Sequence, residues 1–356
     1  MPNLFPQPIP VSRRNDSSPS KLLRATGAGE SSALLAVIAV LVWSAQPAKC
    51  TDEKPHFNFS APQHAARTIN FPRGYSLGKL KFVPVNEPIS AQKLVVMARG
   101  KVVVPADCYS FFEAEHNFFV HPEFVSTLDS DCFDSIQLAQ VALEGGEEGE
   151  VERSLPYLAH LTGLREVLLD HSDVGDGAID RLTVLPNVQH ISLFSTRTDG
   201  SCLRQLSSIK SLRTLNLDQN KIKEENLQYL GSMFFLSNLL LKRCQLTDAG
   251  IANVSNCCGL VVLDISANPN VTDGCLPYLR PLKKLQCLCV NGTRISLSGL
   301  LQLKGLPLKK VIASGERQSA QDLKALKQAF PGVQVLQTTK SKTIDPDTYS
   351  YFAPLH

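Results

Sequence analysis

Apolar positions follow a repeating pattern across residues 164–313. Each occurrence has apolar residues at its first, fourth and sixth positions, and the pattern occurs seven times. The triplets are Leu164/Val167/Leu169, Val188/Ile191/Leu193, Leu212/Leu215/Leu217, Leu236/Leu239/Leu241, Leu260/Leu263/Ile265, Leu285/Leu288/Val290 and Leu308/Val311/Ala313. Successive triplets begin 24, 24, 24, 24, 25 and 23 residues apart. A fixed period of this length indicates stacked units that share one continuous core.

A second apolar set follows each of the first six triplets, with internal steps of 5, 3 and 3 residues. Its members are Val174/Ile179/Leu182/Leu185, Thr198/Leu203/Leu206/Ile209, Ile222/Leu227/Leu230/Met233, Leu246/Ile251/Val254/Cys257, Val271/Leu276/Leu279/Leu282 and Ile295/Leu300/Leu303/Leu306. Steps of three place side chains on one side of a short helix. The alternation at the end of each triplet predicts a strand. Each unit is therefore predicted to be a strand, a turn and a helix.

The turns carry two recurring polar features. The slot after each strand holds a small polar or thiol side chain, at Ser172, Thr196, Asn220, Cys244, Asn268 and Thr293. Thr-Asp-Gly or Thr-Asp-x-Gly sequences precede the helices at 198–200, 247–250 and 272–274. We expect each of these aspartates to accept a hydrogen bond from an unpaired N–H in the first turn of its own helix.

These triplets and turns resemble the leucine-rich repeat family over about half of the chain. The resemblance implies an α/β solenoid, with a curved parallel sheet and short helices outside. It also implies that the polar slot forms a ladder of side chains bonded to neighbouring turns. Leucine-rich repeats are binding scaffolds, so the resemblance implies a protein partner on the concave strand face and neither a cofactor nor a metal.

Two subtypes share the Thr-Asp-x-Gly turns and cysteine-bearing units such as Asn256–Leu260. One is the cysteine-containing repeat of F-box adaptors, and the other is common in bacterial, notably planctomycete, repeat families. The sequence from Leu323 to Val335 resembles the helix and short strand that end the bacterial type. We find no F-box-like segment upstream of the repeats, which favours the bacterial type.

The front of the chain has a different composition. Residues 1–30 carry Arg13, Arg14, Lys21 and Arg24, and Ala33–Trp43 is an unbroken apolar run followed by small residues. A basic flank, a short apolar run and small residues are typical of a signal peptide. The run is short for a full membrane span of about 20 residues, but an uncleaved anchor remains an alternative. We therefore expect an exported or membrane-anchored protein in which residues 1–50 form the leader. If the leader is not cleaved, residues 33–43 would tether the protein to the membrane.

Short β-prone runs follow an expected linker at 51–66. They are Arg67–Phe71, Leu80–Val85, Leu94–Met97, Lys101–Val104 and Tyr109–Phe112, separated by Pro- and Gly-containing turns. Residues 67–130 are predicted to form a small β-rich cap that hides the open end of the core. Phe133, Ile136 and Leu138 suggest a degenerate first repeat, so the solenoid is expected at 131–336 and a tail at 337–356.

Positions of the strands that do not face the core are free to serve binding. The expected concave face includes Leu168, Asp170, His190, Phe194, Asn216, Asp218, Leu240 and Lys242. Phe194, with Leu168 beside it and Asp170 and Asp218 near, is the best candidate patch, because an aromatic anchor with a charged rim is typical of a protein interface. The alternative is a solvated surface with scattered apolar residues.

Candidate chemistry is sparse. Cys287 and Cys289 alternate on one strand, so both thiols should face the concave side, but no second pair completes a tetrahedral metal site. Glu113, Glu115, His116 and His121 form the densest carboxylate and imidazole cluster, without the zinc-protease spacing. Cys202, Cys257 and Cys275 fall on or beside the helix stripe and are expected in the core, and Cys108 and Cys132 are candidates for a disulfide.

The net charge of the chain does not point to any further class of function. The formal net charge is +3 over 356 residues, so it does not indicate a nucleic-acid partner. Our first hypothesis is a non-enzymatic scaffold that binds a protein on its concave face. One alternative is a ligand-binding or enzyme-associated protein whose activity lies in residues 67–130. Another is a ubiquitin-ligase-type substrate adaptor.

Overall fold

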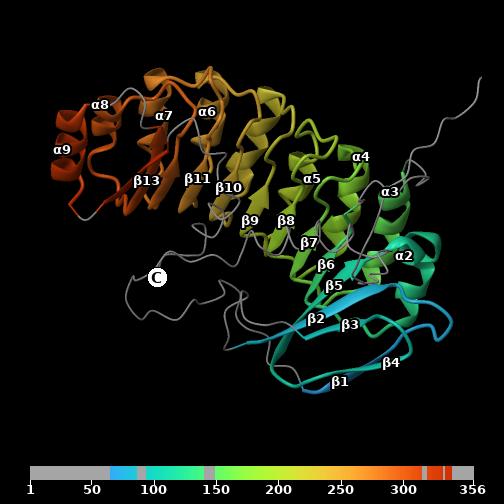
Figure 1. Cartoon of the computed structure of the whole chain (residues 1–356). Helices are drawn as coiled ribbons and strands as arrows, with labels where there is room; N and C mark the ends of the chain where they lie inside the picture. Colours follow the sequence, from blue (N-terminus) through green and yellow to red (C-terminus); the bar gives the residue numbers. More distant parts are fainter. Residues whose placement is uncertain (1–64, 86–93, 140–148, 315–318, 332, 339–356) are drawn as a thin grey trace, which may run out of the picture.

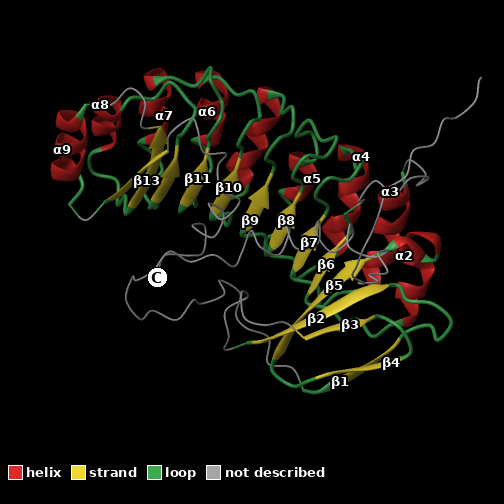
Figure 2. Ribbon diagram, viewed as in Figure 1, coloured by secondary structure: helices red, strands yellow, loops and turns green. Residues whose placement is uncertain are grey.

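The computed structural model describes residues 65–85, 94–139, 149–314, 319–331 and 333–338. Among these residues, twelve strands form one sheet in the order β14-β13-β12-β11-β10-β9-β8-β7-β6-β5-β2-β3, and β1 pairs with β4 in a separate two-stranded sheet. The helices lie along one side of the long sheet and the strands line the other (Figures 1 and 2).

The strands of the repeats are short and regularly spaced. They are β6 (Ser135–Gln137), β7 (Glu166–Leu168), β8 (His190–Ser192), β9 (Thr214–Asn216), β10 (Asn238–Leu240), β11 (Val262–Asp264), β12 (Cys287–Cys289), β13 (Lys310–Ser314) and β14 (Gln334–Thr338). All neighbours in this series pair in parallel, and from β7 to β11 each residue aligns with the residue 24 positions later. The predicted solenoid of strand-turn-helix units is confirmed, although β14 extends to Thr338, two residues into the expected tail.

The connections on the outer side mix α-helical and 3-10 turns. The α-helices are α3 (Glu150–Ser154), α4 (Asp176–Ile179), α5 (Leu203–Leu206), α6 (Asp248–Val254), α7 (Leu276–Leu279), α8 (Leu297–Leu300) and α9 (Ala320–Ala329). The 3-10 helices are η2 (Leu155–His160), η3 (Asp180–Val184), η4 (Glu224–Ser232), η5 (Asp273–Cys275) and η6 (Leu301–Leu303). Both apolar sets of each repeat point between strand and helix and are buried in one continuous cluster.

The predicted polar ladder is present inside the bend after the strands. Asn220 donates from Nδ2 to the carbonyls of Leu193 (2.6 Å) and Leu217 (3.0 Å), and its Oδ1 accepts from the Thr196 N–H (2.9 Å). The Cys244 thiol donates to the Leu217 carbonyl at 3.2 Å. All of these bonds except the one from Asn220 to Leu217 cross from one repeat to its neighbour, so the ladder pairs buried backbone groups that the helix and strand leave open.

Asp199 accepts from the Ser201 N–H of its own turn at 3.0 Å, whereas Asp248 and Asp273 act differently from the expectation. The hydroxyl of Thr247, rather than Asp248, caps α6 by accepting from the Ala249 N–H at 3.2 Å. Asp248 reaches the next repeat instead, where it accepts from the N–H (2.7 Å) and the hydroxyl (2.6 Å) of Thr272. The reason is that the next turn places the N–H and the hydroxyl of Thr272 within reach of the Asp248 carboxylate.

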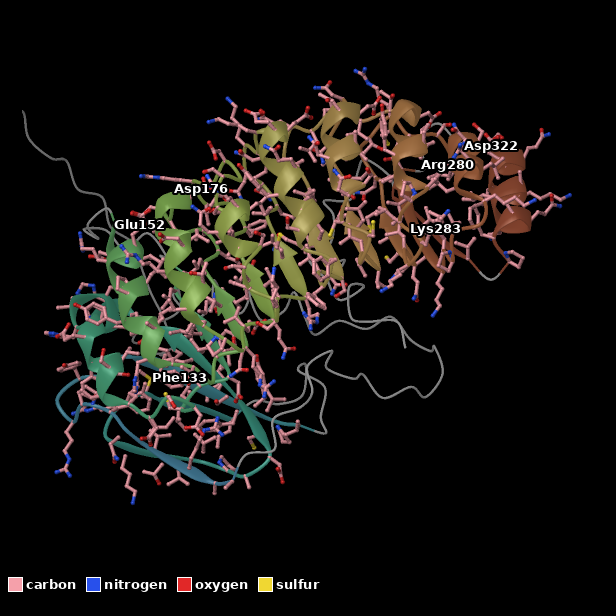
Figure 3. The ribbon with its side chains drawn as sticks, turned by 180° about the vertical axis from the view of Figure 1, so that it is seen from behind. Phe133, Glu152, Asp176, Arg280, Lys283 and Asp322 are labelled. Carbon is pink, nitrogen blue, oxygen red and sulfur yellow. The ribbon has the colours of Figure 1, made fainter. Side chains whose placement is uncertain are left out.

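This inter-repeat acid recurs along the outer side, and we call the set the acidic staples. Each acid accepts a backbone N–H of the turn one repeat later. The pairs are Glu152 with Gly175, Asp176 with Asp199 and Cys202, Glu224 with Thr247, Asp248 with Thr272, and Asp273 with Ser296. Figure 3 shows two of them, Glu152 and Asp176, on neighbouring repeats of the helix side.

The five strands expected before the repeats are present. They are β1 (Arg67–Asn70), β2 (Gly78–Pro84), β3 (Leu94–Met97), β4 (Lys101–Val104) and β5 (Cys108–Ala114), followed by α2 (His116–Val120) and the 3-10 helix η1 (Pro122–Thr127). β2 lies antiparallel between β3 and β5, whereas β5 pairs in parallel with β6. The front segment is thus continuous with the sheet of the repeats, and stacked rings of Phe71, Phe112 and Phe133 fill the junction.

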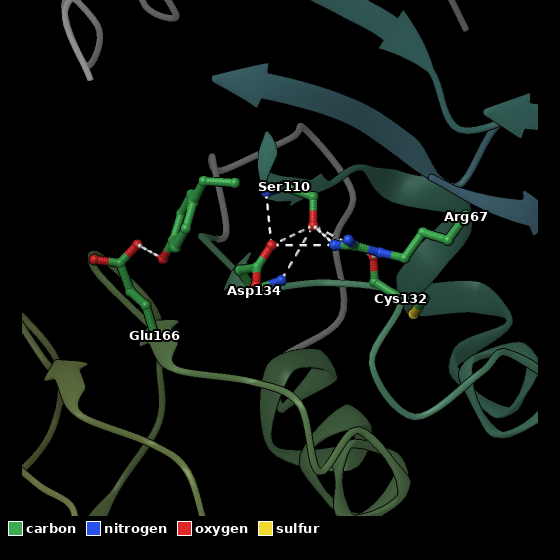
Figure 4. Close-up of polar contacts among 6 residues, drawn as sticks. Arg67, Ser110, Cys132, Asp134 and Glu166 are labelled. Carbon is green, nitrogen blue, oxygen red and sulfur yellow. Dashed lines mark hydrogen bonds and ion pairs between the residues drawn. The ribbon is translucent and has the colours of Figure 1, made fainter. Parts of the chain in front are cut away.

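A buried polar cluster joins β1, β5 and the turn before β6 (Figure 4). Arg67 donates from Nη2 to Ser110 Oγ (2.7 Å) and to Asp134 Oδ2 (3.1 Å). Asp134 also accepts from the N–H (2.8 Å) and the hydroxyl (2.9 Å) of Ser110. Cys132 and Cys108 are both free, buried thiols, so the disulfide suggested by the sequence is absent.

Candidate binding surface on the inner face of the sheet

The inner face is the side of the sheet turned away from the helices. The middle residue of each strand from β7 to β12, and Val311 in β13, points into the core, so the first and third residues point to the inner face. Side chains two positions beyond each strand, such as Asp170 and Phe194, continue the same face. The sequence-derived site residues therefore lie on one surface, spread over β7 to β10 and the residues just after them.

Phe194 is the aromatic centre of this surface and remains partly exposed. Its ring packs edge-on against His171, with 4.8 Å between the ring centroids and 83° between the planes. Leu168 and Asp170, on the neighbouring repeat, are also partly exposed. We define Leu168, Asp170, His171 and Phe194 as the aromatic patch, a small apolar centre with a polar rim.

Asp170 is held in place by hydrogen bonds from the next repeat. Its Oδ1 accepts from the Ser192 hydroxyl and from the Phe194 N–H at 3.2 Å. Ser192 in turn accepts from Asn216 Nδ2 at 3.0 Å. Burial raises the pKa of Asp170, and the bonds from Ser192 and the Phe194 backbone counter this only in part.

Asp170→Asn is expected to change the pH dependence of stability. A carboxyl with a raised folded-state pKa costs stability as pH rises from its unfolded pKa through its folded pKa, because the folded state holds the proton more tightly. The variant lacks this titration but keeps an oxygen acceptor. We therefore expect the free energy of unfolding of the variant, measured by urea denaturation, to increase relative to that of wild type as the pH rises from 4 to 8. A constant difference across that range would contradict the assignment.

A second polar group lies beside the aromatic patch. His190 Nδ1 contacts Glu166 Oε1 at 2.7 Å, while Glu166 Oε2 accepts from the Ser135 hydroxyl at 2.5 Å and from the Tyr109 hydroxyl at 3.4 Å. Burial opposes ionisation of Glu166, but the bonds and charge of His190 outweigh it and lower the pKa of the carboxyl. Sequence reasoning missed the roles of Ser135 and Tyr109, although Glu166 and His190 are one repeat period of 24 residues apart.

The remaining predicted residues differ in exposure. Asn216 is partly exposed, and its Oδ1 accepts from the Asp218 N–H at 2.9 Å. Asp218 is fully buried and accepts from the Lys242 N–H at 2.6 Å, and Leu240 and Lys242 are also buried. The accessible part of the predicted surface is therefore its first half, on β7 to β9.

The other candidate chemistry is not gathered into one site. Glu113 pairs with Lys81, and Glu115 pairs with Lys79 at 2.9 Å, so both carboxylates have lysine partners. His121 packs against Tyr75 at 5.2 Å between centroids, while His116 starts α2. Within the described ranges, no group of three or more His, Cys, Asp or Glu side chains is arranged to hold a metal ion.

The repeat geometry matches known proteins. Two curated relatives, both named leucine-rich repeat-containing protein 42, are 30% identical over 119 residues (Bos taurus) and 31% identical over 103 residues (Homo sapiens). The alignments cover 30% and 26% of this chain and 27% and 24% of the relatives, so the chain matches about a quarter of their length. The chain is a leucine-rich repeat protein.

Three solved structures match part of the chain. An internalin, InlF, and internalin C2 of Listeria monocytogenes cover 63% and 62% of this leucine-rich repeat chain and 78% and 92% of their own. Their sequence identities are 16% and 21%, and their TM-scores are 0.40 and 0.43. The Toll–Spätzle complex of Drosophila matches with 13% identity and a TM-score of 0.39 over 65% of this chain and 34% of that chain. No family model matches this leucine-rich repeat chain.

The apolar run at 33–43 lies outside the described residues. Within the part that the structure describes, no helix is long and apolar enough to cross a membrane.

Proposed function

We propose that this leucine-rich repeat protein is a non-enzymatic scaffold that binds a protein partner through the aromatic patch at the ends of β7 and β8. The carrying observation is a partly exposed phenylalanine, Phe194, braced by His171 on a rigid parallel sheet. Solenoids present extended concave surfaces of this kind to their partners. A rigid aromatic side chain at the centre of a polar rim is the usual anchor of such an interface.

The polar groups around Phe194 suit recognition more than catalysis. Asp170 accepts hydrogen bonds from the Ser192 hydroxyl and the Phe194 N–H, and Glu166 contacts His190. These bonds fix the shape of the surface. The partner that fits has an apolar side chain for the Phe194 ring and a donor for Asp170, whose bonds from Ser192 and Phe194 both go to Oδ1 and not to Oδ2.

Phe194→Ala is expected to weaken capture of the partner at least about thirtyfold, because removal of a central aromatic anchor costs about 2 kcal/mol or more of binding. The measurement is quantitative affinity capture with the full chain. Phe235→Ala is the matched control, since it removes an equally large ring that is 46% exposed on the loop before β10. Equal loss in both variants, or full binding by the Phe194 variant, would count against the proposal.

We also propose, from the sequence of residues 1–43 alone, that the protein is exported or anchored at a membrane. Support comes from the basic flank and the apolar run at 33–43. Fractionation of cells expressing the full chain tests this. Recovery in the cytosol with residues 1–50 still attached would oppose it.

A further inference from the structure

Basic residues gather along one edge of the repeat sheet. Strands β7 to β13 run parallel and in register, so the residues that precede them lie side by side at that edge. Backbone hydrogen bonds connect these residues from Arg165 to Lys309, one repeat after another. We call this edge the rim, and it consists of the loops 161–165, 185–189, 207–213, 231–237, 255–261, 280–286 and 304–309.

The charged residues of the rim all carry the same sign. Its loops contain no Asp or Glu, and every cation in them is partly or fully exposed. The acidic staples lie at the opposite edge, in the turns and first helical residues that follow the strands. The formal net charge of +3 therefore conceals a strongly basic edge. The cations of the rim are Arg165, Lys210, Arg213, Arg280, Lys283, Lys284, Lys304 and Lys309, of which Figure 3 labels Arg280 and Lys283.

The polar contacts of these cations do not neutralise their charge. Lys210 Nζ donates to the Ser207 carbonyl at 2.8 Å, and Arg213 Nη1 donates to the Lys210 carbonyl at 2.9 Å. Arg280 Nε donates to the Gln302 carbonyl at 3.1 Å. In the part of the chain that the structure describes, no ion pair involves a rim residue. The rim therefore presents a positive potential to the solvent.

Two exposed aromatic rings lie at the centre of the rim, in the fourth of its seven loops. Phe234 is 55% exposed and Phe235 is 46% exposed, and their ring centroids are 4.5 Å apart. Lys210 Nζ lies over the Phe234 ring at 5.8 Å from its centroid, and Arg213 Cζ lies over the Phe235 ring at 5.4 Å. Adjacent large apolar side chains left in water indicate a surface that contacts a partner.

We propose that the rim binds the surface of an anionic lipid bilayer. The Phe234 ring enters the headgroup region, and the cations on both sides of it contact the lipid phosphates and carboxylates. Apolar rings beside Lys and Arg are the combination that peripheral proteins use at such surfaces, because the rings gain from leaving water and the cations gain from the negative surface potential.

The shape of the rim favours a flat anionic surface over a nucleic acid. The solenoid is curved, so the rim follows an arc that extends over six strand spacings, roughly 29 Å (Figure 1). A bilayer contacts loops all along such an arc, whereas a straight duplex follows only part of it. Single-stranded nucleic acids bind by stacking bases on open ring faces. A cation lies over one face of each ring, so a base could use that face only by displacing the cation.

The inference reaches beyond the proposed scaffold function, because the rim and the aromatic patch are different surfaces. The patch lies on the inner face, so a molecule bound to a bilayer through its rim keeps the patch accessible to a protein. The inference is also separate from the proposed export or anchoring, which is argued from residues 1–43. Capture of a protein partner and binding of vesicles are therefore independent readouts.

A fluorescent label at Cys258 tests the proposal on the full chain. Cys258 is exposed in the rim loop next to Phe234, whereas the other described cysteines are buried, and Cys50→Ser confines the label to this site. A bimane label shifts its emission to the blue when it leaves water. We expect this shift with vesicles of equal parts phosphatidylserine and phosphatidylcholine, its loss at high salt, and no shift with phosphatidylcholine alone.

The decisive variant reverses two charges of the rim, in Lys283→Glu/Lys284→Glu. Each lysine close to an anionic surface strengthens partitioning roughly fivefold, so we expect vesicle binding to weaken at least about thirtyfold. The matched control, Lys221→Glu/Arg243→Glu, makes the same charge change at exposed residues of the opposite edge and should bind as wild type does. Phe234→Ser should weaken binding at least about fivefold and keep its salt dependence, because it removes apolar contact alone.

Three results would overturn the proposal. The first is sedimentation with anionic vesicles without a shift at Cys258, which would assign membrane binding to another part of the chain. The second is equal weakening in the opposite-edge control, which would show attraction by overall charge without a specific surface. The third is displacement of the labelled rim from vesicles by an oligonucleotide of the same total charge, which would identify nucleic acid as the ligand.

Discussion

Asn268→Ala is expected to lower the free energy of unfolding by roughly 3–5 kcal/mol, one of the two largest effects we foresee. The Asn268 amide donates to the carbonyls of Leu241 (2.8 Å) and Ile265 (2.9 Å). Its Oδ1 accepts from the N–H groups of Cys244 (3.0 Å) and Leu246 (3.1 Å). Alanine leaves these buried groups without partners, and each unsatisfied group costs about 1–3 kcal/mol.

Asn256→Ala is the matched control for this change. Asn256 is exposed, so its truncation should alter stability by no more than about 0.5 kcal/mol. Urea denaturation followed by circular dichroism gives both values. A loss below 1 kcal/mol for the Asn268 variant would show that the bend tolerates open backbone groups, contrary to the structural account of the ladder.

The second large effect is expected for Gly259→Ala, with a loss of about 3 kcal/mol. A Cβ atom at Gly259 would lie 2.3 Å from the Phe234 carbonyl oxygen and 2.8 Å from that of Leu236. Both atoms belong to the backbone of the preceding repeat, so neither can rotate away. The two repeats would have to separate locally, which disturbs the packing of the main core between them.

Gly177→Ala provides the comparison within the same kind of unit. No heavy atom lies within 4 Å of a Cβ placed at Gly177, and the residue is helical in α4. Alanine there should leave stability unchanged or raise it by up to about 1 kcal/mol, because glycine loses more backbone freedom on folding. Thermal denaturation of both variants separates the effect of the steric clash from the effect of replacing a glycine as such. Similar values would refute the clash.

The repeating core was predictable because strand and helix both carry strong periodic signals. The triplets and the second apolar set identify nearly all the main-core side chains between residues 164 and 313, and the polar slot identifies the ladder at Asn220 and Asn268. The cysteines on the helix stripe, Cys202, Cys257 and Cys275, are buried as expected. These features depend on local spacing, which a single sequence displays.

Other features depend on contacts between units, which spacing does not reveal. The partner of Asp248 is Thr272 in the following repeat, whereas a reading of one motif at a time pointed to its own helix. The burial of Cys287 and Cys289 was equally unforeseen, because periodicity predicts which face a side chain occupies and not how exposed it is there. The pairing of Glu166 with Ser135 needs the parallel junction of β6 and β7.

The acidic staples have a consequence for how the chain can change in length. Each staple joins residues 23 to 26 positions apart, so a gain or loss of residues inside a turn that carries a staple would misalign acid and acceptor. The one long unit agrees with this. Its additional residue falls at Pro269–Asn270, an exposed stretch after the ladder residue Asn268. Insertions and deletions are thus confined to a few surface positions, and elsewhere the protein can grow or shrink only by whole repeats.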